Sequence, residues 1–110
     1  MSFYMFQFSY KETALKVLVD HPQDRSEAAA RVIEAHGGKL HHFFFAFGDY
    51  DGVAISEFPD NESATAAVLT VAASGAVASI KTTVLLTPEE AVGAMRRAGS
   101  VESGYAAPAR

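Results

Sequence analysis

A turn-forming segment in the middle of the chain constrains the fold more than any other feature. Residues 48–52 read Gly-Asp-Tyr-Asp-Gly, and Gly and Asp are residues that favour chain reversal. Runs rich in aromatic and β-branched residues flank this segment at residues 39–47 and 53–58, and such runs are typical of strands. Because a loop this short joins antiparallel neighbours, the sequence predicts a β-hairpin at the centre of the chain.

A strand and a helical region are predicted before the hairpin. Residues 2–10 alternate aromatic side chains in the manner of a strand. Thr13 is the expected N-cap of a short helical stretch, which His21-Pro22 interrupts because a proline disfavours helical backbone at the residue before it. A helix then runs over residues 25–36, and Gly37-Gly38 ends it.

A second long helix and a fourth strand are predicted after the hairpin. Asp60 caps the helix, and the strand follows over residues 78–86. A capping box at residues 87–90 then begins a last helix. We therefore expect a single domain over residues 1–98 and a flexible C-terminal tail over residues 99–110, where Gly, Ser, Ala and Pro dominate.

Two strand–helix–strand crossovers that share one hairpin make the ferredoxin-like βαββαβ arrangement, which is an α+β fold. Such a fold consists of a four-stranded antiparallel sheet with its helices on one face. Regular alternation divides the side chains of the second strand between the two faces. One set is Leu40, His42, Phe44 and Ala46, and the other is His41, Phe43, Phe45 and Phe47.

The second strand is apolar on both faces, so both faces should be covered. The helices cover only one of them. A second copy of the sheet is the simplest cover for the other, since isologous dimers are the commonest oligomers. We therefore expect a homodimer through the helix-free sheet face, which makes a dimeric α/β barrel. The alternative is a monomer with an exposed aromatic patch, and such patches are rare on soluble monomers.

The segment Gly48-Asp49-Tyr50-Asp51 resembles the G-x-Y-D signature of the GYD-domain family, within the dimeric α/β-barrel superfamily. The resemblance covers roughly residues 3–90. It includes the aromatic first strand and, in order, Thr13, Arg25, Gly37-Gly38-Lys39, Pro59-Asp60 and Gly75. The resemblance implies a ferredoxin-like fold and a dimer, and it implies no established activity.

Composition narrows the classes of function. The chain has 110 residues, a hydrophobic fraction of 49%, eight Phe and four Tyr, which is typical of a globular protein. It has no Cys, which excludes disulfides, thiol nucleophiles and Cys-ligated metals, and its net charge of −4 disfavours nucleic-acid binding.

No apolar run is long enough to cross a membrane and no signal peptide opens the chain, so we expect a cytoplasmic protein. Nucleotide, flavin and haem motifs and metal-ligand spacings are missing, so we expect no cofactor and no metal.

A mixed lining is expected inside the barrel, where polar sides of the first and last strands meet. Its polar members are Gln7, Ser9, Lys81 and Thr83. Phe43 and Tyr50 complete the residues that we expect to bind a ligand. A mainly apolar concavity with few polar groups is usual for a small-molecule site. The alternative is that Lys81 extends to a sheet edge and that its neighbours only fill the interface.

Four residues are candidates for catalysis: His41, His42, Asp51 and Lys81. Adjacent strand residues point to opposite faces, so the two histidines are not expected to bind one ion, and the one facing the barrel interior could act as a general base. The Asp49-Tyr50-Asp51 loop could bind a cation, donate to a ligand oxygen, or act as acid and base. Alternatively, its Asp residues cap the turn and its Tyr packs on the neighbouring subunit.

Two functions are consistent with these residues. The first, which we favour, is a small cytosolic module that binds a hydrophobic or aromatic molecule in the barrel interior. The second is a cofactor-independent enzyme, such as an oxygenase or isomerase, that uses His41 or His42, Lys81 and the Asp-Tyr-Asp loop. A His or Asp with a perturbed pKa beside a polar partner inside the pocket would favour the enzyme.

Overall fold

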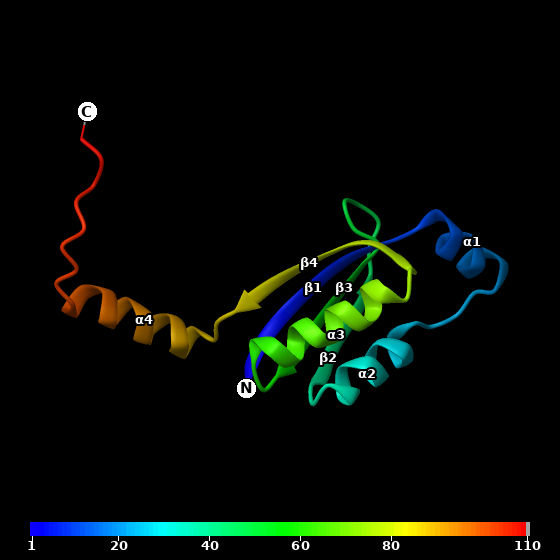
Figure 1. Cartoon of the computed structure of the whole chain (residues 1–110), viewed down its shortest axis with the longest axis horizontal. Coiled ribbons are helices and arrows are strands. Elements are labelled where there is room, and N and C mark those ends of the chain that lie inside the picture. The colour runs from blue at the N-terminus through cyan, green and yellow to red at the C-terminus, as the bar shows by residue number, and fades with distance from the viewer. Residues whose placement is uncertain (110) are drawn as a thin grey trace.

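The computed structural model describes residues 1–109, which form one four-stranded sheet with four helices. In chain order the elements are β1 (Ser2–Tyr10), α1 (Glu12–Asp20), α2 (Ser26–Ala35), β2 (Lys39–Phe45), β3 (Gly52–Phe58), α3 (Asn61–Ala73), β4 (Val77–Leu85) and α4 (Pro88–Ser100) (Figure 1). The strand order is β2-β3-β1-β4, and all neighbouring strands are antiparallel. None of these helices is both long and apolar enough to cross a membrane. The predicted ferredoxin-like α+β fold is confirmed.

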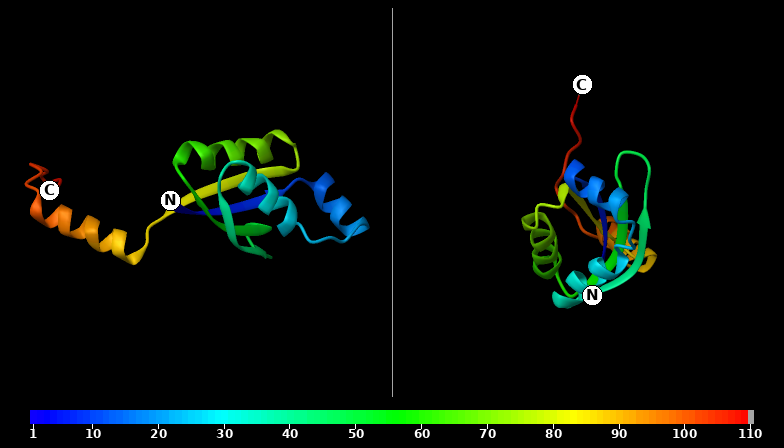
Figure 2. Two further views of the ribbon diagram at one scale, coloured as in Figure 1. Left: turned by 90° about the horizontal axis from the view of Figure 1, so that it is seen from below. Right: turned by 90° about the vertical axis from the view of Figure 1, so that its right-hand side faces the viewer.

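The helices α2 and α3 cover one face of the sheet (Figure 2), and the hydrophobic core lies between them and the strands. Alternate residues of β3 are buried in this core, as the period of two in a strand requires. The core residues are Tyr4, Phe6, Ile33, Ala54, Phe58, Ala64 and Ala67. α1 has no buried residue and lies at one end of the sheet (Figure 1).

Local capping signals mark the beginnings of α3 and α4 and the end of α2. The carboxylate of Asp60 accepts a backbone N–H of the first turn of α3 at 2.8 Å, as predicted. Gly37 follows α2 with a φ of 81°, a left-handed conformation that ends the helix. The capping box at Thr87 begins α4, also as predicted. The predicted cap at Thr13 is wrong, because α1 already begins at Glu12 and has no side-chain cap.

A β-bulge in β2 changes which of its side chains share a face. The pairing of β2 with β3 shifts register between Leu40 and His42, which leaves His41 as an extra residue. His41 lies beside Glu57 on the helix-free face, and His42 pairs with a residue of that same face. The two sets of side chains predicted from regular alternation in the second strand are therefore wrong. The helix face carries Leu40, Phe43 and Phe45. The helix-free face carries His41, His42 and Phe44.

Gly52, the last residue of the central turn, lies beneath the ring of Phe8. A Cβ at this position would overlap three carbons of that ring, so any other residue would displace the ring. The Phe8 ring also packs on Tyr10 and Phe43, with centroid distances of 5.4 and 5.8 Å. The glycine thus allows an aromatic cluster to form at one end of the sheet, on the side covered by helices.

The last helix, α4, projects away from the rest of the structure (Figure 1). None of its residues is buried, and its Val92 and Met95 are 43% and 68% exposed. The helix continues to Ser100, two residues beyond the predicted end of the domain at residue 98. Residues 101–109 have no regular secondary structure, and residue 110 of the predicted tail lies outside the described residues. The flexibility of the tail stays a prediction.

Candidate functional site

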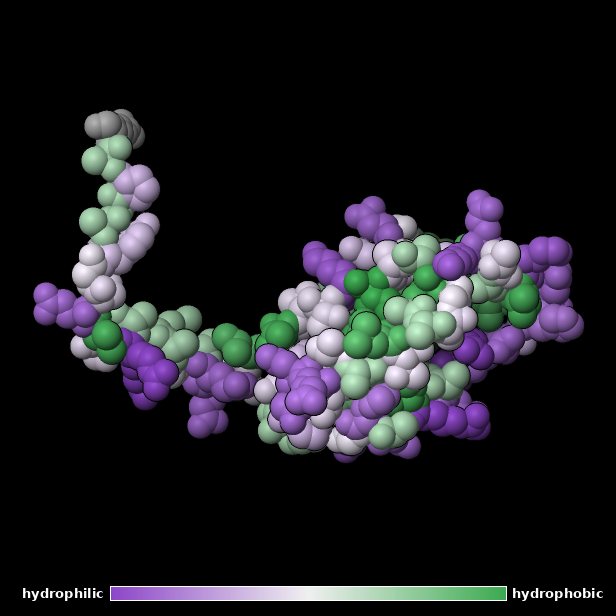
Figure 3. Space-filling model, viewed as in Figure 1, coloured by the Kyte–Doolittle hydropathy of each residue, from purple (hydrophilic) through white to green (hydrophobic). Residues whose placement is uncertain are grey.

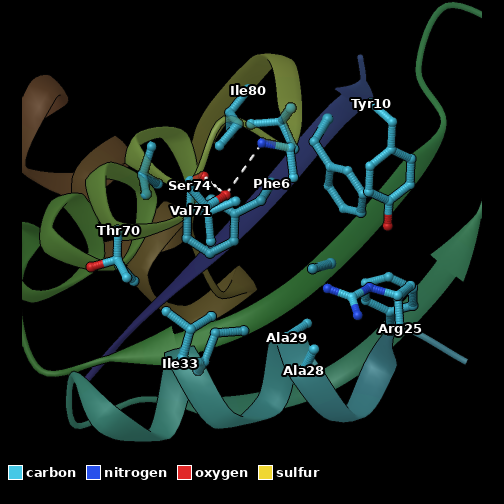
Figure 4. A pocket seen from close by; sticks show the side chains of 18 residues that line it. Phe6, Tyr10, Arg25, Ala28, Ala29, Ile33, Thr70, Val71, Ser74 and Ile80 are labelled. Carbon is cyan, nitrogen blue, oxygen red and sulfur yellow. Dashed lines mark hydrogen bonds between the residues drawn. The ribbon is translucent and has the colours of Figure 1, made fainter. Parts of the chain in front are cut away.

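A pocket of about 290 Å³ lies between α2, α3 and the helix face of the sheet (Figure 4). Its walls are mostly apolar and include Phe6, Val32, Phe43, Val71 and Ile80. The space exists because alanines stand where larger side chains would fill a core: Ala28, Ala29, Ala54 and Ala67. Hydrophobic surface also covers part of α3 on the same side of the molecule (Figure 3). The pocket therefore suits an apolar molecule.

Two polar side chains, Tyr10 and Arg25, face each other at one end of the pocket (Figure 4). Nη1 of Arg25 donates to Oε1 of Gln23 at 2.9 Å, and no carboxylate of residues 1–109 forms an ion pair with the guanidinium. Burial raises the pKa of the Tyr10 phenol; the Arg25 guanidinium acts in the opposite direction, and the Asp51 carboxylate adds to the increase. The Tyr10 hydroxyl is therefore a neutral donor at neutral pH.

Asp51 closes the central turn onto β1. Its Oδ2 accepts the backbone N–H of Tyr10 at 2.8 Å, and its own N–H donates to the carbonyl of Phe8 at 2.8 Å. Its carbonyl accepts the N–H of Ala46, also at 2.8 Å. These contacts fit the alternative in which Asp51 caps the turn, and they fix the backbone at the Tyr10 end of the pocket.

Replacing Asp51 by Ala is expected to lower the free energy of unfolding by about 1–2 kcal/mol, because the Tyr10 N–H loses a charged acceptor. Asp51→Asn keeps an acceptor oxygen in place and should lose less than Asp51→Ala. Asp49→Ala removes the other, exposed carboxylate of the turn and serves as the control with unchanged stability. Urea unfolding measures all three variants, and wild-type stability of Asp51→Ala would contradict the turn-closing role.

Four of the six expected ligand-binding side chains lie together on the helix-free face, along β1 and β4: Gln7, Ser9, Lys81 and Thr83. Gln7 and Lys81 are direct partners across the two strands. Phe43 does not join them, because the bulge in β2 places it on the helix face, where it lines the pocket. Tyr50 lies half-buried in the central turn. The expected lining is therefore divided between the two faces of the sheet.

Both imidazoles lie at one edge of the helix-free face. Nε2 of His41 is 2.6 Å from Oε1 of Glu57, and the His42 ring stacks on Phe44 with centroids 6.1 Å apart. Because β2 and β4 are opposite edges of the sheet, the backbones of the histidines and Lys81 are separated by three strand spacings, roughly 14 Å. The two histidines and Lys81 thus do not meet within one protomer. Among residues 1–109, no three His, Cys, Asp or Glu side chains are placed to hold a metal ion.

The sequence of residues 4–95 matches the GYD domain. The chain belongs to the GYD-domain family. The match ends at residue 95, later than the resemblance over residues 3–90 indicated, and so it takes in the first part of α4. No curated protein matches the chain.

Two longer proteins are among the solved structures that resemble the GYD-domain protein in fold. The transcriptional regulator NMB0573 from Neisseria meningitidis, solved as a complex with L-Met, has a TM-score of 0.55 and 16% identity, and the match covers 79% of this chain and 51% of that chain. MtbAldR has a TM-score of 0.56 and 14% identity, with 97% of this chain and 58% of that chain covered. The GYD-domain protein spans about half the length of these structures, and the likeness is one of fold.

Of the residues that line the pocket, the sequence interpretation named only Phe43 as a ligand-binding residue, and it missed Arg25 and Tyr10 at the polar end. The alternation of β1 does place Tyr10 on the same face as Phe6 and Phe8, under the helices. Arg25 stands directly before a helix whose inner side is rich in alanine. These two signals together could have indicated a polar end of an apolar pocket in the GYD-domain protein.

Proposed function

We propose that the GYD-domain protein is a homodimeric module that binds a small apolar molecule in the pocket between α2, α3 and the sheet. The pocket carries this proposal: it has mainly apolar walls and two polar side chains at one end. Small-molecule sites commonly combine an apolar lining with a few polar groups that orient the ligand. The proposed ligand site therefore lies on the helix face of the sheet, whereas the expected barrel interior lies on the helix-free face.

The proposed dimer forms through the helix-free face, away from the pocket. Met5, Val53 and Ile55 are only half-buried on this face, and Phe44 is 60% exposed. Half-exposed apolar side chains at the centre of a sheet face that no helix covers are unusual on a soluble monomer. A second copy related by a two-fold axis would bury the same face on both protomers.

The enzyme alternative has less support. It requires His41 or His42 to act with Lys81, and the strand order keeps them at opposite edges of the sheet within a protomer. Asp51 already accepts the Tyr10 N–H. A binding function needs no such convergence, so the pocket supports it better.

The probe 1-octanol is expected to bind the wild-type protein with one site per chain, as measured by isothermal titration calorimetry. Ala29 lies in the pocket wall, so Ala29→Phe should fill the space and abolish binding while the helical signal in circular dichroism is retained. Ala72→Phe adds the same ring at an exposed position of α3 and should bind 1-octanol as the wild type does. No binding to the wild type, or equal binding to Ala29→Phe, would contradict the pocket function.

A further inference from the structure

The polar end of the pocket indicates the chemical class of its ligand. We propose that the pocket binds an amphipathic carboxylate, whose chain lies among the apolar walls and whose carboxylate is bound by the Arg25 guanidinium and the Tyr10 hydroxyl. This inference rests on the proposed function, because it concerns the same pocket, and it adds the charge and the head group of the ligand.

Arg25 brings a positive charge to the pocket, and no carboxylate of residues 1–109 forms an ion pair with it. The side chain is half-buried, so water and salt screen its charge less than that of a surface arginine. Its hydrogen-bond partner, Gln23, is a neutral side chain. A guanidinium presents paired N–H donors that match the two oxygens of a carboxylate. An anionic ligand would therefore complete the coordination of Arg25.

The carboxylates near this end of the pocket have partners of their own. Asp24 accepts the backbone N–H and the hydroxyl of the serine that begins α2. Glu27 pairs with Arg31 at 2.6 Å on the exposed side of the same helix. Asp51 accepts a backbone N–H at the end of β1. None of these three carboxylates forms an ion pair with Arg25, so its guanidinium is free to bind a group that enters the pocket.

Tyr10 supplies a second donor at the same end. Its hydroxyl faces Arg25 (Figure 4), and since burial raises the pKa of the phenol, the hydroxyl keeps its proton at neutral pH. An alcohol could hydrogen-bond to these groups but would not gain the charge interaction. An alkylammonium would be repelled by Arg25. The order of affinity should therefore follow the charge of the head group.

Three eight-carbon probes, octanoate, 1-octanol and octylammonium, test this order by calorimetry at pH 7.5. We expect wild-type protein to bind octanoate about 10- to 100-fold more tightly than 1-octanol, since a hydrogen-bonded charge contributes more than a neutral bond. Octylammonium should bind most weakly. Arg25→Gln should lower the octanoate affinity to that of 1-octanol or below, so that the preference for the charged head group is lost, and Tyr10→Phe should cause a smaller loss.

Arg31→Gln is the matched control, because it removes the same charge from an exposed position of α2 and should leave the octanoate preference intact. Arg25→Lys keeps the charge and should retain part of the preference, which separates loss of charge from damage to the fold. Equal affinities for octanoate and 1-octanol, or an unchanged ratio in Arg25→Gln, would overturn this inference and leave the proposed function standing. If none of the three probes binds to the wild type, both this inference and the proposed function are overturned. A segment of a second copy that fills the pocket would give this result.

Discussion

Replacing Ile55 by Asp is expected to convert the protein from a dimer into a monomer, halving the mass measured by light scattering to 11.7 kDa. Ile55 lies at the centre of the helix-free face, where it pairs with Met5 of β1 and His42 of β2. In the proposed dimer a carboxylate at this position is buried without a partner, which costs several kcal/mol. In a monomer it would be half-exposed to water, so the protomer should still fold.

Leu69→Asp is the matched control for Ile55→Asp. Leu69 is 62% exposed on α3, which covers the other face of the sheet. The same exchange of an aliphatic side chain for a carboxylate should therefore leave the mass at twice 11.7 kDa. A monomeric wild type over a wide range of dilution, or a dimeric Ile55→Asp variant, would contradict an interface on the helix-free face.

Truncation of Tyr4 to Ala is expected to lower the free energy of unfolding by roughly 3–5 kcal/mol, the range for large aromatic side chains in cores. Tyr4 is 2% exposed, and its ring packs against Phe6 and Phe58 at centroid distances of 6.1 and 5.8 Å. Its hydroxyl donates to Oδ1 of Asn61 at 2.6 Å. The Ala variant therefore loses both a packed ring and the bond that joins β1 to α3.

Tyr4→Phe separates these two contributions, because it removes the hydroxyl and keeps the ring. Loss of one hydrogen bond should cost about 1 kcal/mol. Urea unfolding followed by circular dichroism measures both variants. If Tyr4→Ala cost no more than Tyr4→Phe, the ring would not stabilise the core as its burial indicates.

The hairpin and the main helices could be predicted because their signals are local: glycines and aspartates at 48–52, the cap at Asp60 and the stop at Gly37. The β-bulge could not be predicted from the sequence, since the residue left unpaired in β2 depends on the register with β3. Because His41 is the extra residue, Phe43 lies on the helix face and both histidines lie on the helix-free face.

The candidate site could be predicted only in part. The hydrogen bonds of Asp51 follow from the chemistry of a turn that the sequence displays. The pocket depends on how far α2 and α3 stand from the sheet, because alanines such as Ala29 and Ala67 either pack closely or leave a space. The approach of Arg25 to Tyr10 likewise depends on the path of the chain after α1, which no local pattern specifies.

Methyl NMR spectra recorded while octanoate is added to the wild-type protein locate the ligand most directly. Ile33 and Ile80 line the pocket, whereas Met5 and Ile55 lie on the helix-free face. Binding in the pocket predicts chemical-shift changes at Ile33 and Ile80 that saturate at one octanoate per chain, with the signals of Met5 and Ile55 unchanged. Changes confined to Met5 and Ile55 would place the ligand in the barrel interior and contradict the pocket between α2, α3 and the sheet.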